Sequence, residues 1–402
     1  MVDLNSLNLC QFDVVVVGGG MVGATQAIAL QNAGLSILLL EQRVPQQDEL
    51  ARPPLRVSAV NLASETLLQS LGIWSAIGES DKCRFDQLAT WEQRDNKLIF
   101  DATEIERPHL GYLVRNEAIQ LAAFDRILNT SENKITLSNA HLSSLKQDDD
   151  KVTLRLSEPG SSKNQVDVFA KLVIGADGAL SKTRQLAHIG TTGWEYAQHC
   201  FSITIKTEFP TQHITWQEFQ QTGPKAFLPL EDGYSCLIWY DAPQTIAQLK
   251  QLSPEALKQE IINCFPPLVG DFNVVTSASF PLVRRQANQY FNGRVVLVGD
   301  AAHVINPLAG QGVNLGFKDV ETLMELLNNT DLSQHGLLAS SLRRYQFKRK
   351  ADAQIMSGAM DLFYHSFSND KAVLKSVRNI VLGVVHNQAW LKAQALKKAV
   401  GL

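Results

Sequence analysis

Three glycines near the start of the chain have the spacing of a phosphate-binding turn. Gly18, Gly20 and Gly23 form the pattern G-x-G-x-x-G, and Glu41 follows further along. In such a turn the first glycine permits a tight bend, the second lets the backbone approach a pyrophosphate, and the third lets a helix pack against a strand. A carboxylate at position 41 can accept hydrogen bonds from ribose hydroxyls and would repel a 2′-phosphate. The pattern therefore predicts a dinucleotide site.

Two later segments could contact the same ligand. Residues 175–184 read GADGALSKTR, where Asp177 could hold its carboxylate near a bound nucleotide; alternatively, Arg184 pairs with Asp177 and fixes the loop. Residues 299–314 read GDAAHVINPLAGQGVN, where Asp300 could accept a hydrogen bond from a ribityl hydroxyl. The glycines and helix N-terminus that follow offer N–H donors and a positive dipole end. Such donors suit the N1–C2=O edge of a flavin, so the predicted cofactor is non-covalently bound FAD.

The candidate cofactor-binding residues are Gly18, Gly20, Met21, Val22, Gly23, Glu41, Gln42, Arg56, Arg115, Asp177, Gly299, Asp300, Pro307, Gly310, Gln311, Gly312, Val313 and Asn314. Two of them have a second interpretation. Arg56 either contacts a phosphate or the flavin or is a solvated surface arginine. Arg115 either faces a phosphate or caps the fold. One candidate for catalysis is His303, whose pKa range suits a base toward a ring hydroxyl; alternatively, its imidazole only hydrogen-bonds the backbone.

The elements that must position these residues can be recognised from their apolar patterns. Val14–Val17 and Ser36–Leu40 are short apolar runs typical of strands buried on both faces, and Ala24–Asn32 between them has a helical pattern. Arg294–Gly299 predicts another buried strand, and Val313–Asn328 predicts the helix after the third motif.

Other segments predict the rest of the architecture. Tyr112–Ile127 has a helical period, Ile135–Leu156 predicts meandering β structure, and Val168–Ile174 predicts a strand leading to Asp177. Residues 194–283 alternate between apolar and polar side chains, with Pro and Gly between the runs. We expect them to form a mostly antiparallel sheet with interspersed helix.

The predicted fold class is α/β: a Rossmann-like FAD-binding domain with an inserted, mostly antiparallel sheet domain for the substrate and a helical C-terminus. A chain of 402 residues is long for a single core. The expected FAD-binding domain comprises residues 1–75, 105–185 and 286–335. Residues 76–104 and 186–285 are expected to form the substrate domain, and residues 336–402 the helical region.

Composition limits the partners and the compartment. The net charge of −3 gives no attraction to nucleic acid. The five cysteines have no metal-type spacing, so we expect reduced thiols and no metal. The first residues lack the features of a signal peptide, and no apolar run approaches the ~20 residues that span a bilayer. The expected location is therefore the cytoplasm.

The three motifs, in this order, resemble the aromatic-ring hydroxylase family of flavoprotein monooxygenases. Within that family, HVINPLAGQGVNLGFKDV at 303–320 is similar to the flavin loop and helix of the hydroxylases of bacterial ubiquinone biosynthesis. Several looser stretches resemble the demethoxyubiquinol hydroxylase branch in particular: GWEYAQHC (193–200), GPKAFLPLEDGYSCLIWYD (223–241), FPLVRRQ (280–286), MDLFYHSFSND (360–370) and LKAQALKKAVGL (391–402).

The resemblance implies a fold like that of para-hydroxybenzoate hydroxylase and an O₂-consuming reaction. Reduced FAD would react with O₂ to a C4a-hydroperoxyflavin, which hydroxylates the ring of a polyprenylated quinol or phenol. No dedicated fingerprint for the electron donor is found, and NAD(P)H is the candidate. Rival interpretations are hydroxylation at another ring position or of another phenol, a non-catalytic FAD-binding scaffold of the biosynthetic complex, and a reductase of isoprenoid double bonds.

The C-terminal residues bear on how a lipid-tailed substrate is reached. From Lys371 to Leu402 there are basic residues but no Asp or Glu, and apolar residues recur at helical spacing. One interpretation is a helix docked on the core. The other is a basic amphipathic surface that touches the anionic inner membrane or other ubiquinone-biosynthesis proteins. The oligomeric state is left open.

Overall fold

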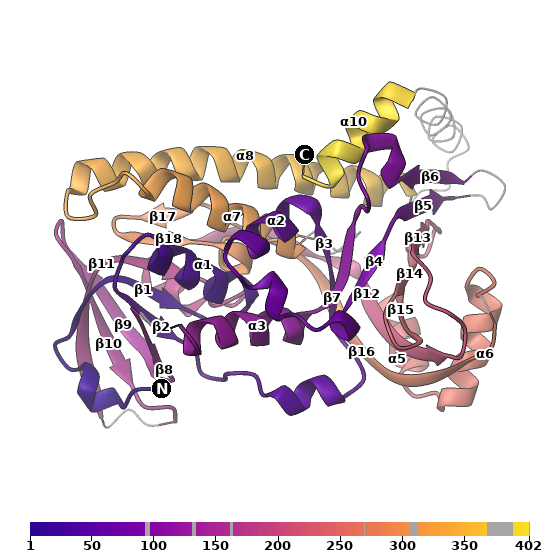
Figure 1. The fold of residues 1–402 in the computed structure, drawn as a ribbon, viewed down its shortest axis with the longest axis horizontal. Helices are drawn as coiled ribbons and strands as arrows, with labels where there is room; N and C mark the ends of the chain where they lie inside the picture. The colour runs from indigo at the N-terminus through magenta and orange to yellow at the C-terminus, as the bar shows by residue number, and fades with distance from the viewer. Residues whose placement is uncertain are drawn as a thin grey trace.

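The computed structural model describes residues 1–92, 97–130, 134–160, 164–268, 270–305, 312–367 and 389–401. Two large sheets stand at opposite ends of the molecule, with a small third sheet between them, and the long helix α8 (His335–Phe367) runs along one side (Figure 1). This arrangement confirms the predicted fold class.

The first sheet contains the predicted parallel strands. In spatial order its main path is β17 (Phe291–Asn292), β18 (Val295–Leu297), β11 (Gln165–Gly175), β1 (Gln11–Val17), β2 (Ile37–Leu40) and β8 (Ile135–Ser138). The antiparallel strands β9 (His141–Gln147) and β10 (Val152–Ser157) extend from the first half of β11. Val14, Val15 and Val16 are fully buried, as expected for a central strand.

Helices cover this sheet and bring later parts of the chain onto it. α1 (Met21–Asn32) packs against α3 (Asn116–Leu128) and α7 (Gly312–Leu327), and α7 packs against α8. The hydrophobic core of this half therefore contains residues from both ends of the chain.

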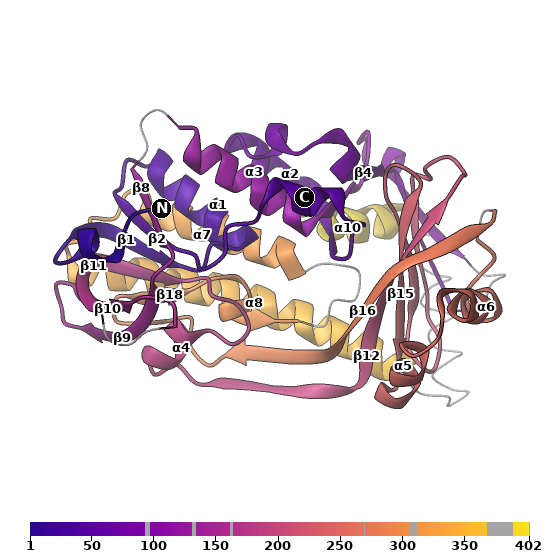
Figure 2. The same ribbon diagram turned by 90° about the horizontal axis from the view of Figure 1, so that it is seen from below.

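The second sheet is almost entirely antiparallel, as predicted for residues 194–283. Its order is β19 (His303–Val304), β16 (Phe272–Ala287), β12 (Thr191–Thr207), β15 (Tyr234–Asp241), β14 (Lys225–Pro229), β13 (Ile214–Glu218), β5 (Gln87–Trp91) and β6 (Leu98–Asp101). Its outer face packs on α5 (Pro243–Leu249) and α6 (Pro254–Cys264). The long strands β12 and β16 run side by side from this sheet toward the first one (Figure 2).

The third sheet corrects one prediction. The sequence predicts a helix over Tyr112–Ile127, but Gly111–Arg115 forms strand β7, and α3 begins at Asn116. β7 pairs with β3 (Val57–Asn61) and β4 (Lys82–Phe85). Aromatic and β-branched side chains favour a strand, and two pairing partners from elsewhere in the chain decide between strand and helix.

The remaining elements are short. They are η1 (Leu4–Leu7), η2 (Gln47–Ala51), α2 (Leu62–Ser70), η3 (Trp74–Ala76), η4 (Glu79–Asp81), η5 (Ala102–Ile105), α4 (Lys182–Leu186), η6 (Gly299–Ala301) and α10 (Ala389–Ala399). Across the part of the chain that the structure describes, no helix is both long and apolar enough to cross a membrane.

Candidate active site

The glycine turn after β1 has the packing that its sequence predicts. Gly18 has φ +98°, and its N–H donates to the carbonyl of Leu40 at 2.8 Å. A Cβ on Gly18 would lie 2.5 Å from the carbonyl oxygen of Ala176, and one on Gly23 would lie 1.9 Å from that of Gly18. Both glycines are therefore required by close backbone approach within the protein.

Gly20 differs from its two neighbours in the motif. A Cβ at Gly20 would meet no atom of the described residues within 4 Å. Gly20 is also the N-cap of α1, and its position offers no side chain to cap the helix. The open space beside unpaired N–H groups at a helix N-terminus is the environment that a pyrophosphate requires.

Glu41 stands directly after β2 and reaches back to the turn. Its Oε2 accepts the N–H of Gly19 at 2.6 Å, and its Oε1 accepts the N–H of Arg43 at 2.9 Å. A carboxylate has about four acceptor positions, so ribose hydroxyls can still bind. The neighbouring Gln42 is exposed, and its Nε2 lies 3.5 Å from Nδ1 of His141.

In the second motif the structure contradicts one of the two interpretations, the pairing of Arg184 with Asp177. The carboxylate of Asp177 accepts hydrogen bonds from the Ser181 hydroxyl and from the N–H and hydroxyl of Thr183, at 2.9 and 3.0 Å for the latter two. Arg184 donates to the carbonyls of Ala179 and Ala301 instead of hydrogen-bonding Asp177. Asp177 therefore shapes the start of α4, and its contact with a cofactor stays a prediction.

The third motif brings a carboxylate to the other end of the site. Gly299 has φ +57° in the turn η6, and Asp300 follows it. Although Asp300 is exposed, nearby protein atoms desolvate its carboxyl and raise its pKa, an effect that His303 partly offsets. A hydrogen bond from a ligand hydroxyl would replace the lost solvation.

The helix after this motif begins beside the glycine turn. A Cβ on Gly316 would lie 2.5 Å from a methyl group of Val22, and one on Gly299 would lie 3.4 Å from the same side chain. Val22 in α1 thus touches both the third motif and α7. Met21 and Val313, the residues at the two helix starts, are both half-buried.

The two helix N-termini provide a consistent site for FAD. A Cβ at Gly312, like one at Gly20, would have 4 Å of free space around it among the described residues. The open space at the start of α1, together with the carboxylates of Glu41 and Asp300, fits a dinucleotide with a ribityl chain. Asn314 holds the α7 start to β3, since its amide donates to Ala59 and accepts from Asn61. Three predicted contacts, Pro307, Gly310 and Gln311, lie outside the described residues.

The two arginine candidates have opposite surroundings. Arg56 is exposed, and its guanidinium has no hydrogen bond or ion pair to any residue that the structure describes, so it is available to a ligand. Arg115 is buried and donates to the carbonyls of Leu50 and Arg52, each at 2.8 Å, and of Glu49 at 3.3 Å. The second interpretation of Arg115, a role in the fold, accounts for these contacts.

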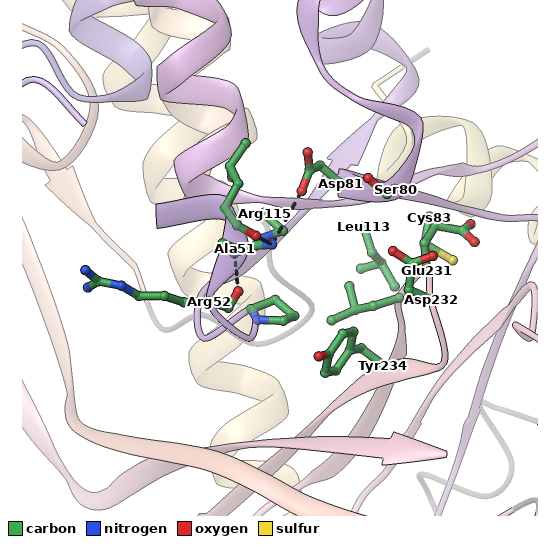
Figure 3. Close-up of a pocket in the computed structure, with 13 residues that line it drawn as sticks. Ala51, Arg52, Ser80, Asp81, Cys83, Leu113, Arg115, Glu231, Asp232 and Tyr234 are labelled. Carbon is green, nitrogen blue, oxygen red and sulfur yellow. Dashed lines mark hydrogen bonds and ion pairs between the residues drawn. The ribbon is translucent and has the colours of Figure 1, made fainter. Parts of the chain in front are cut away.

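The loop that Arg115 holds covers a cavity of about 200 Å³, which Arg115 lines together with Asp81, Glu231 and Tyr234 (Figure 3). Asp81 forms an ion pair with Arg115 at 3.5 Å. Further along, the same loop is fixed by hydroxyls of the second sheet: Ser202 donates to the carbonyl of Leu55 and Thr204 to that of Pro54. The loop leads directly to Arg56.

His303 is buried and bonded to a side chain, not to the backbone. Its Nε2 lies 2.7 Å from Oδ2 of Asp319, a carboxylate that also accepts from Arg349. Asp319 and Arg349 lie in α7 and α8, and the sequence patterns carry no signal for either. Gln120 in α3 was missed for the same reason; its amide donates to the carbonyl of Gly19 at 2.8 Å.

Comparison with known proteins agrees with this geometry. Residues 11–356 match the FAD binding domain family. The chain is 41% identical over 396 residues to 3-demethoxyubiquinol 3-hydroxylase of Escherichia coli (strain K12), covering 97% of this chain and 98% of that protein. It is 31% identical to the ubiquinone hydroxylase UbiL of Rhodospirillum rubrum, covering 97% of this chain and 89% of that protein.

The fold is also found in solved structures. The crystal structure of p-nitrophenol 4-monooxygenase PnpA from Pseudomonas putida superposes with a TM-score of 0.79 at 19% identity, covering 97% of this chain and 98% of that chain. This similarity concerns the fold alone. Together, the family match, the full-length relatives and the motifs in place show that the chain belongs to the FAD-binding family of aromatic-ring hydroxylases.

Proposed function

We propose that this protein is an FAD-dependent monooxygenase that hydroxylates the ring of a polyprenylated quinol in ubiquinone biosynthesis, at the demethoxyubiquinol step. The observation that carries the proposal is the 41% identity, along nearly the full length of both chains, to a 3-demethoxyubiquinol 3-hydroxylase. The site supports it, since its helix starts and carboxylates fit FAD. When bound and reduced, FAD supplies the oxygen chemistry with O₂ as co-substrate, and NAD(P)H is the proposed electron donor.

The residues of this chain would bind and orient the cofactor. The open N–H groups at Gly20 and Gly312 would stabilise negative charge on the pyrophosphate and on the flavin edge. Glu41 would accept hydrogen bonds from the ribose and Asp300 from the ribityl chain, while the free guanidinium of Arg56 would contact a phosphate or the flavin. The second sheet would hold the substrate ring, in agreement with the proposed division of the chain into cofactor and substrate domains.

The proposal is tested by mass spectrometry of quinones from an aerobically grown strain that lacks this gene. We expect accumulation of a ubiquinone precursor that lacks one ring oxygen. The wild-type gene should restore ubiquinone, whereas Asp300→Ala should not, and purified Asp300→Ala should carry much less bound flavin because a ribityl hydrogen bond is lost. The mass of the precursor identifies the step, and a normal ubiquinone profile in the deletion strain would contradict the proposed substrate.

We also propose that the C-terminal region contacts an anionic membrane surface, where a lipid-tailed quinol is available. Its last helix, α10, has features of both interpretations, a helix docked on the core and an exposed basic surface. Leu396 and Val400 are buried against Phe85 and Leu230, so one face is docked on the protein. Lys397 and Lys398 are exposed on the other side. Lys392, also in α10, forms an ion pair with Glu104, and the remaining basic residues, Lys371, Lys375 and Arg378, lie outside the described residues.

Charge reversal at the exposed lysines tests this contact without removing the buried face. The double variant Lys397→Glu/Lys398→Glu is expected to bind vesicles containing anionic lipid at least about thirtyfold more weakly, since the loss of two basic residues at ~1 kcal/mol each costs ~2 kcal/mol. Co-sedimentation with anionic vesicles measures the effect, and neutral phosphatidylcholine vesicles are the control. Equal binding of both proteins to anionic vesicles would show that α10 serves only the fold.

A further inference from the structure

A buried carboxylate lies directly behind the turn that presents Asp300. Asp319 in α7 is completely buried, and three groups surround it. Its Oδ2 accepts the backbone N–H of Gly299 at 2.8 Å and lies 2.7 Å from Nε2 of His303. Its Oδ1 accepts Nε–H of Arg349 at 2.7 Å. One side chain thus joins the third motif to both long helices.

Electrostatics keep this carboxylate ionised. Burial by itself would raise the pKa of Asp319, but the charges and hydrogen bonds of His303 and Arg349 outweigh it and hold the pKa below its usual range. An ionised carboxylate accepts hydrogen bonds and cannot donate, so all three contacts are satisfied at once. Hydrogen bonds to a charged group are also roughly twice as strong as neutral ones.

The carboxylate selects one of the several backbone conformations that a glycine can adopt. Gly299 has φ +57°, and its N–H points at Asp319 instead of at a strand neighbour. The next residue is Asp300, whose side chain is exposed. The orientation of Asp300 therefore depends on where the Gly299 peptide is held.

Arg349 connects this arrangement to α8. Its side chain is almost completely buried, and besides Asp319 it contacts Asp352 at 2.6 Å and donates to the carbonyl of Leu315 at 3.2 Å. These contacts fix the guanidinium from three sides. Arg349 therefore fixes the position of Asp319 from α8, a helix that contains none of the predicted cofactor-binding residues.

We propose that Asp319 is a positioning residue for FAD binding: with Arg349 and His303 it holds the Gly299 turn so that Asp300 meets the ribityl chain. This inference rests on the proposed role of Asp300. In this proposal His303 supports the Gly299 turn, and α8 contributes to FAD affinity through Arg349. Because coupling is reciprocal, bound FAD should in turn stabilise the Asp319–Arg349 contact and the middle of α8.

The test compares FAD affinities of apo-proteins, measured by quenching of flavin fluorescence, with their thermal stabilities. Asp319→Asn keeps the shape of the side chain but loses the charge and one acceptor. We expect its Kd for FAD to rise about 10- to 100-fold, which corresponds to the loss of a hydrogen bond to a charged group. Arg349→Lys should also raise the Kd for FAD, by a smaller factor, since one ammonium cannot make all the hydrogen bonds of the guanidinium.

Arg294 provides a matched control. It is also fully buried, precedes the same strand β18, and donates to the carbonyls of Lys171 and Leu332 at 2.9 and 2.8 Å. Arg294→Lys should lower the melting temperature of the apo-protein as much as Arg349→Lys does, while its Kd for FAD stays within about twofold of wild type. An equal loss of FAD affinity in Arg294→Lys would mean that general destabilisation, not positioning, explains the effect.

A measurement on the unaltered protein covers the case in which Asp319→Asn does not fold. Addition of FAD should slow hydrogen exchange in a peptide around Arg349, but not in one around Asp149, whose carbonyl Arg294 binds. Unchanged exchange around Arg349, or a folded Asp319→Asn with wild-type affinity, would overturn the proposal. Asp300→Asn separates the two hypotheses: if Asp300→Asn binds FAD normally, the proposed role of Asp300 fails, whatever Asp319 does.

Discussion

Replacement of Gly20 by alanine is expected to weaken FAD binding in a protein that still folds, whereas replacement of Gly23 is expected to destabilise the apo-protein. The space beside Gly20 is free of atoms of the described residues within 4 Å, and its φ of −63° suits any residue. The added methyl group would then occupy the volume predicted for the pyrophosphate. We expect the Kd for FAD to rise about 10- to 100-fold, the equivalent of ~1–3 kcal/mol of overpacking.

Gly23→Ala is the matched variant within the same turn. Its Cβ would lie 1.9 Å from the carbonyl oxygen of Gly18, so the backbone of helix or strand must move. We expect the apo-protein to lose about 3 kcal/mol or more of its free energy of unfolding. Denaturant unfolding of apo-proteins and FAD titration of folded ones separate the two effects. Equal apo stability of the two variants would contradict the packing described for the motif.

Replacement of Arg115 by methionine is expected to destabilise the protein even without cofactor. Methionine fills similar volume but leaves the carbonyls of Glu49, Leu50 and Arg52 without their donor. It also leaves the half-buried Asp81, whose pKa burial already raises, without its cationic partner. The expected loss is about 2–4 kcal/mol of the free energy of unfolding.

Cleavage by a glutamyl endopeptidase locates the effect, because Glu49 precedes Leu50 in the released loop and should be cleaved faster in Arg115→Met. The control is Arg155→Met, which removes an exposed arginine paired with Asp167; exposed pairs contribute only ~0–1 kcal/mol. The alternative interpretation of Arg115 predicts the opposite result. A phosphate contact would lower FAD affinity while apo stability and loop cleavage remain as in the wild type.

Much of the cofactor half could be predicted from the sequence because its signals are local. An apolar run such as Val14–Val17 is typical of a central strand, and Gly23 is required by a contact with Gly18, five residues earlier. The second sheet was likewise indicated by alternation. In Tyr112–Arg115 the apolar residues have helical spacing, but pairing with β3 and β4 makes the segment a strand, so the spacing indicated the wrong element.

The missed residues act over distances that no spacing reveals. Asp319 and Arg349 lie on different helices, and the buried ion pair between them reads in the sequence as two ordinary polar positions. Arg115 binds backbone carbonyls, which carry no side-chain signature in the loop they belong to. The same applies to Arg184, whose partners are the carbonyls of two separate motifs.

The order of the strands along the chain has a consequence for biosynthesis. β1 pairs with β11, and β11 pairs with β18, so the cofactor sheet is completed only when residues near 297 have emerged. Asp319, the carboxylate behind the Gly299 turn, gains its ion-pair partner only when Arg349 has been synthesised. Strands β13, β14 and β15 are consecutive antiparallel neighbours, and β12 pairs with β15, so these four strands can pair during translation without that delay. We expect the nascent chain to form this part of the second sheet first and to become able to retain FAD only near the end of synthesis.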